Sequence, residues 1–147
     1  MPKSEPFMYD CASALDDART QLEELGQEMR DWFDNMPENL QGGDKGCAVD
    51  EAANSLESAT GYLEDAPECA TKVPQFSVEG MTKKRPTRAY RCGYACSIIT
   101  STIEAVQTYL AGKEIPEDVS DELEEWVSSL QACLDEAEGV TFPGMFG

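Results

Sequence analysis

The sequence has 147 residues, with 29 acidic and 11 basic side chains and no histidine, so its formal charge is −18 and its pI is near 4.1. A hydrophobic content of 41% supports one folded domain and excludes an acidic disordered tail. The missing histidine excludes Ser-His and Cys-His nucleophile pairs, the helical di-iron motif and the commonest zinc ligand. We therefore expect a protein that is not an enzyme, and its charge is the feature that a function has to explain.

Apolar residues recur at intervals of four and three residues in the amino-terminal part, which predicts amphipathic helices. The first apolar seam runs from Cys11 to Met36 and ends before Pro37, because the residue before a proline avoids the helical conformation. A second helix is predicted over about residues 48–65. The glycine-rich stretch between the two, residues 37–46, is predicted to form a turn.

Two further helices are predicted in the carboxy-terminal part. The third seam runs from Cys92 to Leu110, and the fourth begins at Pro116 and ends before Gly139. We expect an all-α single domain, a bundle of about four amphipathic helices that form two hairpins. Its predicted parts are an acidic helical hairpin (1–70), a basic loop or short hairpin (71–91), a second helical hairpin (92–138) and an apolar tail (139–147).

The connection between the second and third helices differs from the rest of the chain in charge. Residues 1–71 hold 17 acids and 4 bases (net −13), residues 72–96 hold 1 and 6 (net +5), and residues 97–147 hold 11 and 1 (net −10). We expect a long irregular insert, with a short hairpin near residues 76–81, that folds onto acidic helices of its own chain or of a neighbouring subunit. Direct nucleic-acid binding is an alternative that the overall charge opposes. The bases of the insert are Lys83, Lys84, Arg85, Arg88 and Arg91.

Four of the six cysteines lie on the apolar seams: Cys11, Cys92, Cys96 and Cys133. We interpret them as small core residues, because free cysteine is among the most buried residue types. A four-thiolate metal site inside the bundle is one alternative, although no Cys-x-x-Cys motif supports it, and one or two disulfides are another. We predict no metal and no other cofactor.

Acidic doublets repeat seven residues apart on the first and fourth helices, away from the apolar seams. Between residues 117 and 138, nine acids and no base lie along about 33 Å of helix, or one charge per ~3.7 Å. A DNA strand carries one phosphate per ~3.4 Å. The pattern predicts a surface whose carboxylates take the place of phosphates, with mere solubility or adaptation to high salt as the alternatives. The candidate partner-binding residues are Asp16, Asp17, Glu23, Glu24, Asp31, Glu117, Asp118, Asp121, Glu122, Glu124 and Glu125.

In length, charge and helical content, the chain resembles the small acidic DNA mimics with which phages and mobile elements block host defence, the anti-restriction and anti-CRISPR proteins. The stretch WFDNMPENLQGGDKGCAVDEAANSLESATGYLEDA, residues 32–66, also resembles a helix-turn-helix hairpin of phage proteins. The resemblance implies an inhibitor that binds the basic groove of a host DNA- or RNA-handling enzyme.

The expected partner is therefore a basic-grooved nucleic-acid-binding protein, without direct contact to nucleic acid or a membrane. The amino terminus lacks a secretory signal profile and no stretch is apolar enough to span a bilayer, so we expect a soluble protein of the host-cell cytoplasm. A homodimer is compatible with this expectation. The alternative function is a self-assembling scaffold in which the basic insert contacts acidic helices of the next subunit.

Overall fold

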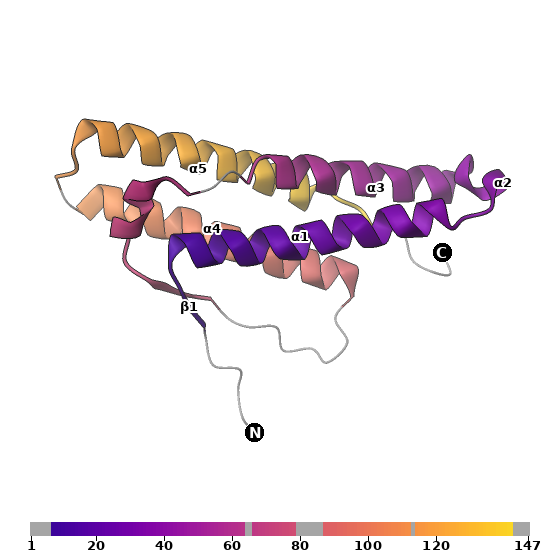
Figure 1. Ribbon diagram of the computed structural model, residues 1–147, viewed down its shortest axis with the longest axis horizontal. Coiled ribbons are helices and arrows are strands. Elements are labelled where there is room, and N and C mark those ends of the chain that lie inside the picture. Colours follow the sequence, from indigo (N-terminus) through magenta and orange to yellow (C-terminus); the bar gives the residue numbers. More distant parts are fainter. Residues whose placement is uncertain (1–6, 64–65, 79–86, 113, 143–147) are drawn as a thin grey trace, which may run out of the picture.

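The computed structural model describes residues 7–63, 66–78, 87–112 and 114–142 (Figure 1). The prediction of a mainly helical protein is confirmed. The elements in chain order are β1 (Phe7–Tyr9), α1 (Cys11–Asp34), α2 (Glu38–Gln41), α3 (Asp44–Gly61), the 3-10 helix η1 (Glu68–Lys72), β2 (Phe76–Val78), α4 (Arg88–Gly112) and α5 (Glu117–Glu138).

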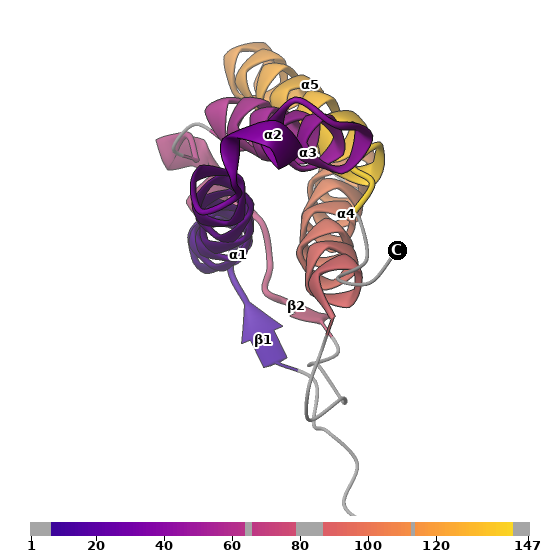
Figure 2. The same ribbon diagram turned by 90° about the vertical axis from the view of Figure 1, so that its right-hand side faces the viewer.

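The long helices run along one common axis, and α1 and α3 are displaced along it relative to α4 and α5 (Figure 1). The colour gradient shows that α1 and α5 run in one direction and that α3 and α4 run in the other. Both α1 and α5 pack against α3 and against α4, so α1 and α5 occupy diagonal positions (Figure 2). The outer faces of α1 and α5 therefore point away from each other.

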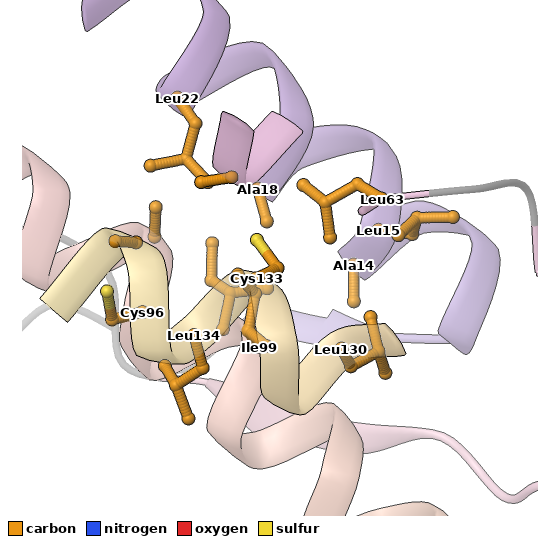
Figure 3. Close-up of a cluster of buried hydrophobic side chains, with 14 of the residues drawn as sticks. Ala14, Leu15, Ala18, Leu22, Leu63, Cys96, Ile99, Leu130, Cys133 and Leu134 are labelled. Atoms are coloured by element: carbon orange, nitrogen blue, oxygen red, sulfur yellow. The ribbon is translucent and has the colours of Figure 1, made fainter. Parts of the chain in front are cut away.

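The apolar seams meet in one core, which holds side chains from all four long helices of the described chain. Leu22 of α1, Leu56 of α3, Ile98 of α4 and Leu123 of α5 are each completely buried. Figure 3 shows one part of this core, where residues of α1 such as Ala18 face Ile99 of α4 and Cys133 of α5. Burial of these seams fixes which side of each helix remains for solvent and partners.

The prediction of a simple turn over residues 37–46 was wrong. Residues 38–41 form α2, and α3 begins at Asp44, four residues before the predicted start. The reason is a close approach of α2 to the first turn of α3 at Gly46. A Cβ atom at this position would lie 2.4 Å from the carbonyl oxygens of both Leu40 and Gln41, so only glycine permits the contact.

The second half of the predicted hairpin near residues 76–81 lies outside the described residues, and its first half is a strand with a distant partner. The strand Phe76–Val78 pairs antiparallel with Phe7–Tyr9 near the amino terminus, with Met8 opposite Ser77. Residues 71–91 also include part of η1 and the first turn of α4, so this connection is not a loop throughout. The strand β2 packs against α4 (Figure 2).

Within the described residues, no helix is both long enough and apolar enough to cross a membrane.

Candidate functional site

The acidic stripe of α5 is presented to solvent along the first half of the helix. Leu123, Trp126 and Leu130 are buried on the inner side, which turns the charged positions outward. Glu117 and Asp118 lie in the first turn, where the positive end of the helix dipole favours carboxylates. The predicted residues of this stripe are all exposed: Glu117, Asp118, Asp121, Glu122, Glu124 and Glu125.

No base among the described residues forms an ion pair with any of these six α5 carboxylates. The ion pairs among the described residues instead join Arg30, Arg88 and Arg91 to acids of α1 and α3. Dense like charge lowers the stability of a helix when nothing offsets it. The α5 stripe is therefore a concentrated negative surface without an ion pair to a described base.

Several carboxylates of the acidic stripe of α1 already have partners within their own chain. Asp17 is half-buried and accepts a hydrogen bond from the Tyr9 hydroxyl at 2.5 Å, and Glu24 lies 3.9 Å from Arg91. Asp31 accepts a hydrogen bond from the Gln27 amide at 2.8 Å. Asp16 and Glu23 remain exposed. Because α1 and α5 are diagonal, the structure does not bring the two predicted stripes together.

Tyr9 attaches β1 to the helices at this point. Its hydroxyl also lies 3.5 Å from the hydroxyl of Tyr94 on α4. Burial, followed by the hydrogen bond to Asp17, raises the pKa of Tyr9 well above its usual value. The hydroxyl therefore stays protonated and remains a donor to the carboxylate.

Glu28 of α1 is the central acceptor of an ion-pair cluster that the sequence did not reveal. Its carboxylate accepts hydrogen bonds from Arg88 Nε at 3.2 Å and from Arg91 Nη1 at 2.9 Å and Nη2 at 2.5 Å. The hydrogen bond from Arg91 is the largest cause that lowers the pKa of Glu28. Glu28 lies outside the acidic doublets, and its partners are about 60 residues away in the sequence, so no local signal indicated it.

Two bases of the predicted insert therefore lie in the first turn of α4 and bind an acidic helix of the same chain, as expected for intramolecular folding. Arg88 also lies over the ring of Trp32, 5.4 Å from its centroid, and Lys45 approaches the same ring at 5.7 Å. Such contacts hold the cations close to α1. The other three predicted bases of the insert, Lys83, Lys84 and Arg85, lie outside the described residues.

The seam cysteines are buried, as predicted. Cys11, Cys92, Cys96 and Cys133 are at most 8% exposed, and all six cysteines of the chain are free thiols. Among the described residues, no group of three or more Cys, Asp or Glu side chains is arranged to hold a metal ion. Cys92 and Cys96 do line a cavity of about 430 Å³, together with Glu138 and Phe142.

Comparison with known proteins gives no family for this chain. No family model and no curated protein matches it. Among solved structures, a pectin methylesterase inhibitor from Arabidopsis thaliana is similar at a TM-score of 0.35 and 12% identity, over 90% of this chain and 77% of the inhibitor chain. This similarity is too low to carry an argument about function.

The ion-pair cluster at Glu28 makes a prediction about stability and pH. Glu28→Gln is expected to lower the free energy of unfolding at pH 7 by about 1 kcal/mol, since the pairs are half-exposed. The folded-state pKa of Glu28 is lowered, so its contribution is complete above the unfolded pKa of 4.5 and is lost as pH falls through the folded value. Urea unfolding at about pH 7 and pH 3 measures the free energy of unfolding of the variant and of the parent. The difference between these two free energies should be smaller at pH 3 than at pH 7.

Glu23→Gln is the matched control for this prediction. Glu23 is exposed on the same helix and forms no ion pair with a described base. Equal effects of the two substitutions at pH 7 would show that Glu28 acts only through the net charge.

Proposed function

We propose that this protein is a non-enzymatic acidic binding protein, an inhibitor of the phage type that mimics nucleic acid. Its α5 face would occupy the basic groove of a host DNA- or RNA-handling defence enzyme, and a four-helix bundle of α1, α3, α4 and α5 would hold that face rigid. The supporting observation is the set of six exposed α5 carboxylates with no ion-pair partner among the described bases.

The α5 face fits this role better than the α1 face. A surface that replaces phosphates has to keep its charge until the partner arrives, because desolvated or internally paired carboxylates contribute little to electrostatic steering. On α1, Asp17 and Glu24 already interact with Tyr9 and Arg91 of the same chain. We therefore assign the partner-binding surface to Glu117, Asp118, Asp121, Glu122, Glu124 and Glu125.

The positions of three of the described arginines argue against direct nucleic-acid binding. Arg30 pairs with Asp50 and Glu57 of α3, and Arg88 and Arg91 pair with Glu28. A phosphate that approached these arginines would have to compete with carboxylates already in contact, inside a protein of charge −18. These contacts favour a protein partner with a basic groove.

The test is an affinity capture at low salt from a host-cell lysate on the immobilised full-length chain. Bound proteins are eluted first with a duplex DNA oligonucleotide at constant salt, then with a salt gradient, and are identified by mass spectrometry. Occupation of a nucleic-acid groove predicts that a DNA- or RNA-handling enzyme leaves in the DNA step, because both ligands need the same groove. Recovery of the chain itself, without such an enzyme, would contradict the proposal and favour the self-assembling scaffold.

A further inference from the structure

Two thiols on α4 stand apart from the other buried cysteines because they border a cavity. Cys92 and Cys96 are one helical turn apart, are 4% and 8% exposed, and both line the cavity of about 430 Å³ beside the end of α5. The small residues Ala89, Gly93 and Ser97 lie on the same wall. The cavity therefore has both cysteines in its lining.

The helical spacing of this pair disfavours a direct disulfide. Residues at positions i and i+4 of a helix have Cβ atoms about 5–6 Å apart, whereas a disulfide needs about 3.5–4.5 Å. A single bridging ion suits the larger separation, since metal–sulfur bonds of about 2.3 Å place the two sulfur atoms up to about 4.6 Å apart. The i, i+4 spacing on an intact helix thus favours a pair bridged by one ion over a disulfide.

The thiol of Cys92 links α4 to the end of α5 beside the cavity. Its Sγ atom donates a hydrogen bond to the carbonyl oxygen of Ala137 at 3.5 Å. Ala137 and Glu138 line the cavity together with the two cysteines. A thiolate is the ligand form of cysteine, so a cation has to displace the protons of both thiols.

We propose that Cys92 and Cys96 form a two-thiolate site for a soft monovalent metal cation of the Cu(I) class. Thiolates select soft cations, and a linear two-coordinate ion needs no third donor. Zinc prefers four ligands, and the described residues offer no group of three. Binding converts two thiols and one M⁺ into an M(SR)₂⁻ complex and releases two protons, with no change in oxidation state.

Cys133 provides the matched contrast to this site. It lies on α5, is completely buried and does not line the cavity. Figure 3 shows its sulfur directed toward Ala18 of α1 and apart from Cys96. A buried cysteine without access to the cavity should make no difference to binding, whereas the two cavity thiols should be required together.

The test is an anaerobic titration of the full-length chain with Cu(I) in competition with a chromogenic Cu(I) chelator. We expect one Cu(I) per chain, two protons released per Cu(I), and an affinity that falls at least about 100-fold in Cys92→Ser/Cys96→Ser. Cys47→Ser/Cys69→Ser and Cys133→Ser should bind within about threefold of the parent. Circular dichroism of each variant checks that the helices are retained.

Two outcomes would overturn the proposal. One is a parent chain that binds Cu(I) no more tightly than Cys92→Ser/Cys96→Ser while both remain helical. The other is an equal loss of affinity in Cys133→Ser, which would assign binding to thiols in general. Neither outcome bears on the α5 surface, because the thiol cavity and the acidic stripe use different residues.

Discussion

Replacement of Glu117, Asp118, Glu124 and Glu125 by lysine is expected to abolish capture of the basic-grooved partner. The substitutions change the formal charge from −18 to −10 and remove four of the six exposed carboxylates from the predicted surface. If each lost ion pair contributes about 0.5–1 kcal/mol, and like-charge contacts replace them, affinity should fall at least about 100-fold. The measurement is the amount of enzyme retained on the variant at fixed low salt.

A matched variant on α1 separates the position of the charges from their number. Asp16, Glu23, Glu24 and Asp31 are all exposed, and their replacement by lysine changes the formal charge by the same amount. We expect this variant to keep most of the partner, with a modest loss from weaker long-range attraction. Equal losses in both variants would mean that the partner recognises net charge and not the α5 face.

The α5 variant should remain folded, which makes loss of binding interpretable. Lysine at positions 117 and 118 loses the favourable interaction with the helix dipole, about 0.3–1 kcal/mol for each position, while relief of repulsion along α5 acts in the opposite direction. The buried side of the helix, with Leu123 and Leu130, is unchanged. Far-ultraviolet circular dichroism should therefore match that of the parent.

Much of the helical fold could be predicted because its signal is local. The seam residues Leu22, Val49, Ile99 and Leu130 recur at helical spacing in the sequence and are buried in the structure. The ends of α3 and α5 predicted from proline and glycine lie within a few residues of the ends in the structure. Periodicity of this kind depends only on neighbours within one helix, so the sequence alone contains it.

The features that were missed depend on contacts between distant segments. The strand Phe7–Tyr9 has only three residues, too few for alternation to be recognised, and its pairing with Phe76–Val78 joins segments about 70 positions apart. The helix α2 has only four residues and exists through its contact with α3 at Gly46. Neither signal is present in any single window of the sequence.

The candidate site also combines a feature that the sequence predicted with one that depends on contacts between distant segments. The acidic doublets of α1 and α5 have the same spacing, and sequence reasoning treated the two stripes as equivalent. Their surroundings differ, because Tyr9 and Arg91 reach the α1 stripe, while no described base forms an ion pair with the α5 stripe. Which stripe keeps its carboxylates free of partners in its own chain is thus a tertiary property, set by where β1 and the start of α4 lie.

The second large effect is expected in the core, at the contact between α1 and α3. Leu56 is completely buried on α3, and its Cβ lies 3.5 Å from the position that a Cβ at Gly26 of α1 would take. Leu56→Ala should lower the free energy of unfolding by about 2–5 kcal/mol, because backbones this close cannot easily collapse into the space left behind. The side chain of Leu40 is 54% exposed, so Leu40→Ala should change the free energy of unfolding by less than about 0.5 kcal/mol.

Urea unfolding followed by circular dichroism measures both effects, and a loss below about 1 kcal/mol for Leu56→Ala would contradict the tight packing of α1 on α3. The same variant also separates stability from recognition. Leu56 does not lie on α5, so a chain that is destabilised but still folded at low temperature should retain the partner that the α5 lysine variant releases. If Leu56→Ala loses stability but keeps the partner, and the α5 lysine variant keeps its stability but loses the partner, then the packing of α1 on α3 determines stability and the α5 carboxylates determine binding.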